Sequence, residues 1–436
     1  MSQITRRHVL TAASATALGT AAAATFAAPA TASPPWSGNQ HQRVVLIDID
    51  GFDPRLLEGK YSDVHPLPRI RQLRRSGAYG TAAATFSSYS NSSRTSIATG
   101  TYPSNHRNTG YYLNAHGTAI TQERYIEPGV ETIAQALRRQ NRTGAYVQWY
   151  AVQNYGADYG DIQQLYVQPG GTVTERVDDA IALLSGEPVN SGGEEVTFTE
   201  PPEFLAVYAS DVDGYLHDNG FARNGLMETL EEVDTQIGRL LDAIEDLGLG
   251  DSTTVILTGD HGLREWTKPL LPNLVALLEE TGSSVESIAA GATASPDTDI
   301  VVYGAPRTAD ITLRHEMSQR RLRRLIRSLE RLEGVASVYE KNDLSRIGAS
   351  DKLGHLVIEP VEPYHFSTTM DGVRRASHGG LEEARVPLIL AGTGVRRGAR
   401  LHHSSLTDVA PTICAILGVS APSTAQGRII REAFQH

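Results

Sequence analysis

The chain of 436 residues contains a single cysteine, Cys414. One cysteine cannot form a disulfide within the chain, so the fold has to be stabilised by its hydrophobic core, for which this length is ample. Cys414 lies in an apolar stretch at 410–417. We therefore expect it to be a small buried hydrophobic side chain rather than a reactive thiol.

An excess of positive charge and a long apolar run are also missing. The formal net charge is −11, which argues against a nucleic-acid-binding surface. No segment beyond the N-terminal region is long and apolar enough to span a membrane. Internal repeats are absent as well, and the composition is otherwise ordinary for a soluble globular protein.

The N-terminal region has the pattern of an export signal. Arg6 and Arg7 precede an uncharged stretch rich in alanine and threonine, which ends near a small-residue cleavage site at 30–32. Paired arginines before such a stretch predict a twin-arginine signal peptide over 1–32, followed by a linker at 33–42. A membrane anchor and a disordered alanine-rich tail are the alternatives. The twin-arginine export machinery is then a partner, and the location is secreted, cell-envelope or periplasmic.

Strand and helix patterns alternate from residue 43 onward, which predicts an α/β fold with a mostly parallel central sheet flanked by helices. The run at 43–50 is continuously apolar, as in a strand buried on both faces. Apolar residues at three- and four-residue spacing predict a long helix over 224–247. Further strands are expected at 143–151, 204–209, 253–257 and 386–390, further helices at 131–140 and 406–417, and a surface loop at 186–200.

A small α+β cap insertion is predicted at 264–376, between two parts of the catalytic core at 43–263 and 377–436. Strands are expected at 299–303, 336–339 and 355–359. A helix is expected at 317–331, and its arginines indicate either a solvated face or a basic surface that recruits anions. These arginines are Arg320, Arg321, Arg323, Arg324 and Arg327.

Acidic residues and histidines follow the predicted strands. Because ligands bind at the carboxyl ends of parallel strands, these side chains are expected to converge in one crevice. Three aspartates and three histidines suit two zinc ions, since zinc accepts both imidazole nitrogen and carboxylate oxygen. An isolated Asp–His surface pair or a structural histidine is the alternative for each motif, and Asp211 is a competing ligand. The six candidates are Asp50, Asp213, His217, Asp260, His261 and His378.

The segment 89–100 supplies a candidate nucleophile. A helix is predicted to begin near 90–92, and its free N–H groups and dipole would favour an anionic ligand. A hydroxyl bound to a divalent ion is deprotonated more easily and becomes a good nucleophile. Arg94 could direct two donors at an oxyanion. A serine-rich loop with an ordinary capping serine is the alternative.

The order of these motifs resembles the alkaline phosphatase superfamily and, within it, the type I phosphodiesterase/nucleotide pyrophosphatase group. The resemblance covers about residues 43–425. Its motifs are Asp-Gly-Phe from 50, Ser-x-x-x-Arg from 90, Thr-Gly-x-Tyr-Pro-x-x-His from 99, Asp-x-x-x-His from 213, Gly-Asp-His-Gly from 259 and Ser-His-Gly-Gly from 377. The resemblance implies that Ser90 is the nucleophile. It also implies one zinc on Asp50, Asp260, His261 and Ser90, and another on Asp213, His217 and His378.

The sequence departs from the group at one point. Ser92, Ser93 and Arg94 stand where the group usually has Pro-Asn-His, so Ser93 or Arg94 would have to replace an amide that holds a phosphoryl oxygen. With Arg94, the segment also resembles a sulfatase signature, but Ser92 replaces the proline that formylglycine formation needs. The histidine-rich ligand set suits zinc better than a calcium site built from oxygen ligands.

The sequence therefore predicts a metal-dependent phosphodiesterase or nucleotide pyrophosphatase with two Zn²⁺ ions and a Ser90 phosphoryl-enzyme intermediate. The predicted substrate is a small-molecule phosphoester, a class that includes nucleotides. A phosphomonoesterase, a sulfatase-like hydrolase and a non-catalytic metal-stabilised binding protein are the alternatives. Arg94 would favour monoesters if it bound a second phosphate oxygen. Four tyrosines lie in segments near the predicted cleft, either to stack a nucleobase or to pack ordinarily: Tyr111, Tyr112, Tyr155 and Tyr159.

Overall fold

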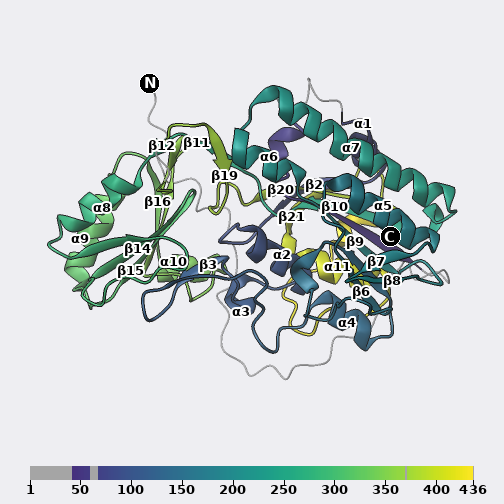
Figure 1. Ribbon diagram of the computed structural model, residues 1–436, viewed down its shortest axis with the longest axis horizontal. Helices are drawn as coiled ribbons and strands as arrows, with labels where there is room; N and C mark the ends of the chain where they lie inside the picture. Colours follow the sequence, from purple (N-terminus) through teal and green to yellow (C-terminus); the bar gives the residue numbers. More distant parts are fainter. Residues whose placement is uncertain (1–41, 59–66, 369–370, 436) are drawn as a thin grey trace. The chain divides into compact units, whose positions relative to one another are not determined.

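The computed structural model describes residues 42–58, 67–368 and 371–435. Its main sheet has eight strands in the order β21-β2-β20-β10-β1-β9-β5-β6 (Figure 1). β20 runs antiparallel to both its neighbours, and every other adjacent pair in this sheet is parallel. The predicted α/β fold is confirmed. The strands are β1 (Arg43–Ile49), β2 (Ala78–Ala83), β5 (Gly144–Val147), β6 (Gln164–Val167), β9 (Phe204–Ala209), β10 (Thr253–Gly259), β20 (Arg385–Gly392) and β21 (Arg400–Ser405).

Helices cover both faces of this sheet, which explains why its central strands are mainly apolar. In β1, Val45 and Ile47 pack against one layer of helices, whereas Val44 and Leu46 pack against the other. The first layer contains α1 (Pro68–Ser76), α5 (Val173–Ser185) and α7 (Arg223–Asp246). The second contains α2 (Ser90–Thr99), α4 (Ile133–Arg139) and α11 (Val409–Ile416). Cys414 is buried in α11, as expected.

The strand register brings the predicted site residues to one edge of the sheet. Ile49, the last residue of β1, pairs with Ala209 of β9 and with Gly259 of β10. Asp50 and Asp260 therefore emerge side by side, and the helix after β9 begins beside them. Because β20 is antiparallel to β10, its first residues lie at this same edge. The segment just before β20, which includes His378, is brought there too.

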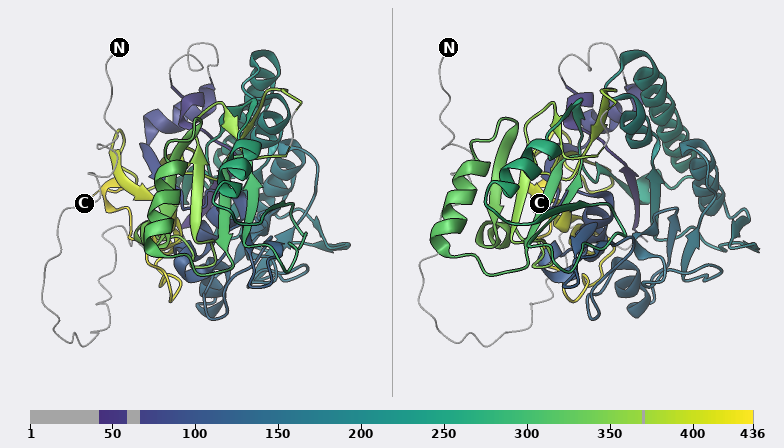
Figure 2. Two further views of the ribbon diagram at one scale, coloured as in Figure 1. Left: turned by 90° about the vertical axis from the view of Figure 1, so that its left-hand side faces the viewer. Right: turned by 60° about the vertical axis from the view of Figure 1, so that its left-hand side comes forward.

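A second sheet lies within the predicted insertion, in the order β13-β14-β15-β17-β16. α8 (Leu271–Glu279) and α9 (Gln319–Leu329) pack on one of its faces, and Figure 2 (left) views the sheet from the side of these helices. Side chains of the opposite face join clusters with core residues. The strands are β13 (Val285–Ile288), β14 (Ile300–Ala305), β15 (Thr308–Leu313), β16 (Val335–Glu340) and β17 (Leu356–Pro360). The exact limits of the insertion stay a prediction.

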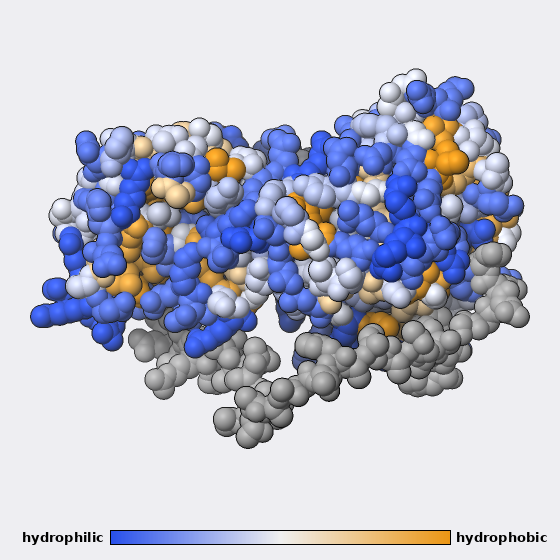
Figure 3. Space-filling view, turned by 90° about the horizontal axis from the view of Figure 1, so that it is seen from below, coloured by the Kyte–Doolittle hydropathy of each residue, from blue (hydrophilic) through white to orange (hydrophobic). Residues whose placement is uncertain are grey.

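Other expectations have mixed outcomes. The five predicted arginines of α9 are all exposed. The loop predicted at 186–200 contains a short hairpin of β7 (Val189–Ser191) and β8 (Glu194–Val196). The predicted signal peptide and nearly all of its linker lie outside the described residues. Within the described ranges, no helix has the length and apolarity needed to cross a bilayer. On the face in Figure 3, hydrophobic residues form small separate patches.

Candidate functional site

Ser90 is the first residue of α2, directly after the N-cap residue Tyr89. Tyr89 makes no side-chain capping bond, and Ser90 itself is not the capping residue. The Ser90 Oγ instead lies 2.9 Å from Nε2 of His261. The Ser90 side chain therefore contacts a candidate metal ligand instead of capping the helix. It does so at a helix end whose dipole favours an anion.

The first ligand group consists of Asp50, Asp260 and His261, all of them buried. Nε2 of His261 lies 3.3 Å from Oδ1 of Asp50 and 3.2 Å from Oδ2 of Asp260. The Asp260 side chain is oriented by the backbone N–H groups of Gly51 and His261, which donate to its Oδ1 at 3.2 and 3.0 Å. Asp50 Oδ2 accepts a hydrogen bond from the Tyr208 hydroxyl at 2.6 Å. One oxygen of each carboxylate is thereby held by the protein.

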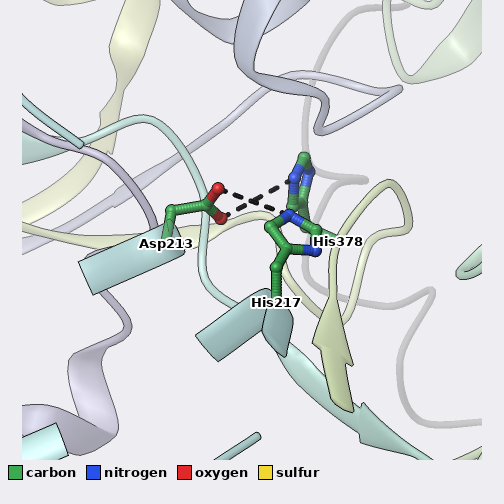
Figure 4. A group of neighbouring side chains, drawn as sticks. All are labelled: Asp213, His217 and His378. Carbon is green, nitrogen blue, oxygen red and sulfur yellow. Dashed lines mark ion pairs between the residues drawn. The ribbon is translucent and has the colours of Figure 1, made fainter. Parts of the chain in front are cut away.

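The second ligand group consists of Asp213, His217 and His378 (Figure 4). Asp213 and His217 lie one turn apart on α6 (Asp211–Asn219), so both side chains reach the same point. Nε2 of His217 and of His378 lie 3.3 and 3.8 Å from the Asp213 carboxylate. Nδ1 of His378 lies 2.9 Å from the Ser88 carbonyl oxygen, which makes Nδ1 the donor and leaves the Nε2 lone pair free. Asp211 belongs to neither group, and its Oδ1 accepts from the Val173 N–H at 3.1 Å.

The two groups adjoin each other. The rings of His261 and His378 stack at 3.4 Å between centroids, with planes inclined by 10°. Burial lowers the pKa of His378 to about 3, with the charge of His261 adding to the effect. For His261, burial opposes protonation, but Asp260 and Asp50 raise its pKa to about 9. Burial raises the pKa of Asp50 to about 8 although Arg94 opposes the shift.

Arg94 does not occupy the position that the sequence suggested. Its side chain is fully buried and contacts three carboxylates: Nε lies 2.9 Å from Asp48, and Nη2 lies 3.0 Å from both Asp50 and Asp260. Its Nη1 donates to the Tyr150 hydroxyl at 2.8 Å. The expected oxyanion role does not fit these contacts, because the guanidinium is committed to buried anions. Ser93 is also buried and does not line the cavity.

Ser90, Asp50 of the first group and all three residues of the second group line a cavity of about 430 Å³, whereas Asp260 and His261 lie buried behind it. Of the four tyrosines singled out in the sequence, only Tyr111 lines it. Tyr112 and Tyr159 contact Lys352 and Tyr166, and the Tyr155 hydroxyl accepts from the Ile126 N–H. Sequence reasoning missed five polar or aromatic lining residues, namely Tyr89, Asn91, Tyr150, Tyr208 and Tyr303.

An aromatic wall forms one side of this cavity: Tyr89, Tyr111 and Tyr303. The rings of Tyr89 and Tyr111 meet edge to face at 5.2 Å, and Tyr111 and Tyr303 lie 5.4 Å apart. Tyr303 comes from β14 of the second sheet, on the face opposite α8 and α9. The insertion therefore contributes directly to the cavity beside the ligand groups.

The residues of both groups fit divalent cations. Asp50 Oδ1, Asp213 Oδ1 and Asp260 Oδ2 are buried without a hydrogen-bond partner among the described residues. Three buried carboxylates, those of Asp48, Asp50 and Asp260, contact the single guanidinium of Arg94. Buried negative charge in excess of its partners is costly unless cations compensate it. Mixed imidazole and carboxylate donors are the set that zinc accepts.

Comparison with known proteins places the chain in a family. The model of the type I phosphodiesterase/nucleotide pyrophosphatase family matches residues 44–381. Mouse bis(5'-adenosyl)-triphosphatase is 22% identical over 408 residues, which cover 88% of this chain and 79% of that protein. Rat ectonucleotide pyrophosphatase/phosphodiesterase family member 1 is 26% identical over 232 residues, which cover 51% of this chain and 24% of that protein.

Solved structures show the same fold. Human ectonucleotide pyrophosphatase/phosphodiesterase 5 superimposes with a TM-score of 0.68 at 16% identity, covering 91% of this chain and 100% of that chain. The murine protein of the same name gives a TM-score of 0.64 at 16% identity, with 87% and 96% covered, and its inactive variant has been solved in complex with AMP. The chain therefore belongs to the type I phosphodiesterase/nucleotide pyrophosphatase family of the alkaline phosphatase superfamily, which supports hydrolysis of phosphodiester or pyrophosphate bonds.

Proposed function

We propose that this protein cleaves phosphodiester or pyrophosphate bonds through a covalent Ser90 intermediate, with two divalent ions, preferably Zn²⁺, in its two ligand groups. The observation that supports this proposal is the position of the Ser90 hydroxyl. It lies 2.9 Å from Nε2 of His261 at the start of α2, and it opens into the cavity that the second group also lines. A half-buried hydroxyl with these neighbours has the surroundings that activation of a nucleophile requires.

Asp50, Asp260 and His261 would hold one ion beside Ser90, and Asp213, His217 and His378 would hold the other. When bound, such ions lower the pKa of a coordinated hydroxyl and stabilise charge on the attacking and leaving oxygens. Ser90 Oγ forms a bond to phosphorus while the bond from phosphorus to the leaving oxygen breaks. Water then attacks the phosphorus of this Ser90 ester, the bond from phosphorus to Oγ breaks, and Oγ regains a proton from the water as the phosphorylated product leaves. The N-terminus of α2 favours the anionic group throughout.

The cavity favours a diester over a monoester. None of the described residues that line it is a lysine or an arginine, and Arg94 is occupied by carboxylates. Among the described residues, neither a lysine nor an arginine is therefore available for the second negative charge of a monoester. The wall of Tyr89, Tyr111 and Tyr303 offers apolar and edge surfaces to a flat ring. Together with the nucleotide-processing names of the relatives, this wall makes a nucleotide the proposed substrate class.

Paired initial rates on bis-p-nitrophenyl phosphate and p-nitrophenyl phosphate test the proposal. With purified protein of known metal content, we expect the diester to be cleaved at least about tenfold faster at equal concentration. A chelator should abolish the activity, and added Zn²⁺ should restore it, because the ligand groups require divalent ions. Faster hydrolysis of the monoester would support the phosphatase alternative. Metal binding without hydrolysis of either ester would indicate a binding protein.

Export through the twin-arginine pathway is part of the proposal. It is supported by Arg6 and Arg7 and by the small-residue site at 30–32. Protein recovered outside the cytoplasm should begin close to Ser33 on N-terminal sequencing. An intact N-terminus on exported protein would instead support an anchor.

A further inference from the structure

Arg307 is a buried arginine of the insertion, and its side chain is only 1% exposed. It lies in the turn between β14 and β15, and its guanidinium points out of that sheet toward the segment after His378. Nε donates to Glu383 at 2.7 Å, and Nη2 lies 3.2 Å from Glu382. The remaining donors reach the carbonyl oxygens of Pro360 and Tyr364 at 3.1 and 3.2 Å. Arginine is suited to this position because its fixed fork satisfies several acceptors at once.

Glu383 is the buried partner that ties Arg307 to the site. Its side chain is fully buried, and Arg307 is the only cation in ion-pair contact with it among the described residues. Its second oxygen accepts the Gly380 N–H at 2.9 Å, and its carbonyl oxygen accepts the Gly262 N–H at 2.7 Å. Glu383 therefore fixes the loop after His378 and the residue after His261 together.

The loop at 378–380 is also hydrogen-bonded to Ser88, which lies two positions before Ser90. The Ser88 N–H donates to the Gly379 carbonyl oxygen at 3.1 Å, and Ser88 Oγ donates to that of Gly380 at 2.7 Å. Ser88 Oγ in turn accepts from the Gly379 N–H at 3.1 Å, and the Ser88 carbonyl oxygen accepts from His378 Nδ1 at 2.9 Å. A Cβ on Gly380 would lie 2.4 Å from Oε1 of Glu359, so the loop has little room to shift.

We propose that Arg307 is a positioning residue: through Glu383 it holds the loop that carries His378, and thereby sets His378, His261 and the start of α2 relative to one another. This inference rests on the proposed function of that site. It assigns the insertion a second task besides lining the cavity. A single guanidinium from the insertion aligns a residue of each ligand group with the nucleophile. Loss of partners that orient metal ligands typically costs 10- to 100-fold in metal affinity or activity.

The test compares Arg307→Gln with the wild-type protein on bis-p-nitrophenyl phosphate and in metal retention. We expect kcat to fall about 10- to 100-fold with KM within about threefold, because the loop is misaligned while the cavity wall remains. The chelator concentration that removes half of the bound zinc should fall by a similar factor. Arg107→Gln is the matched control, since Arg107 joins the core to the insertion through Asp351 at 2.7 Å, on the exposed surface. It should change neither quantity.

Arg307→Lys should recover part of both losses, because lysine restores the charge beside Glu383 but not the fork. The inference is overturned if Arg307→Gln melts at a lower temperature yet keeps kcat and zinc retention within about threefold of wild type. If Arg307→Gln does not fold, Arg307→Lys and Glu383→Gln decide by the same two readouts, and wild-type values in both would overturn it. A wild-type protein that binds zinc but cleaves no diester contradicts the proposed function alone, and zinc retention then still decides the role of Arg307.

Discussion

Replacing Ser90 by alanine should reduce diester hydrolysis by at least about 10³-fold, because the substitution removes the atom that we propose attacks phosphorus. The fold should be retained, since Ser90 is not the N-cap residue of α2 and its Oγ contacts His261 rather than the helix backbone. Zinc should also be retained, because the three protein ligands of each group remain. The measurements are kcat, zinc content by elemental analysis and the melting temperature.

Ser93→Ala is the matched control for this prediction. Ser93 lies on the same helix, is fully buried, and its Oγ has no hydrogen-bond partner among the described residues. Its removal should leave kcat within about threefold of wild type. Near-normal turnover by Ser90→Ala would show that another group attacks phosphorus, and a large loss in Ser93→Ala would show that Ser93 takes part in substrate binding after all.

Replacing Arg94 by glutamine should destabilise the folded protein by about 3–5 kcal/mol, the usual cost of removing one partner from a buried ion pair. The side chains of Arg94, Asp48 and Asp260 are fully buried, and Asp50 is nearly so. Without the guanidinium, these carboxylates would stay buried together, and His261 would be the one side chain in the described part of the chain that could offer them a positive charge by ion-pair contact. The loss should be larger after chelation than with zinc bound, because a bound ion compensates part of the same charge.

Urea unfolding of the metal-free and zinc-loaded proteins measures this difference in the free energy of unfolding. Arg176→Gln is the control, since Arg176 is also buried but donates its hydrogen bonds to the carbonyl oxygens of Tyr208 and Gly171. It should lose less, about 1–3 kcal/mol. Equal losses in the two variants, or a loss in Arg94→Gln that is independent of zinc, would show that the charge of Arg94 does not balance the carboxylates.

The α/β architecture could be predicted because its central strands are mainly apolar runs with an acidic residue one or two positions after them. β1, β9 and β10 are of this kind, and their common edge follows from the parallel arrangement. The edge-side strands β2 and β21 were missed, because one is mainly alanine and glycine and the other contains two histidines and two serines. Their strand structure depends on pairing with neighbours rather than on local preference.

The six candidate ligands could be identified from the sequence, but the place of Arg94 could not. The motif around Arg94 suggests a substrate contact, whereas the structure turns its guanidinium toward Asp48, in the interior of β1. Asp48 was the available signal: a carboxylate inside a strand buried on both faces needs a cation. The aromatic wall was not predictable, because Tyr303 reaches the cavity only through the packing of the second sheet against the core.

The most direct test of the two-group site is the number of zinc ions per chain in the wild type, in Asp260→Asn and in Asp213→Asn. Each substitution removes one carboxylate from one group and leaves the other group intact. We predict two ions per chain in the zinc-loaded wild type and about one in each variant, with diester hydrolysis lost in both. A wild-type protein that holds no zinc, or variants that hold as much as the wild type, would contradict the account.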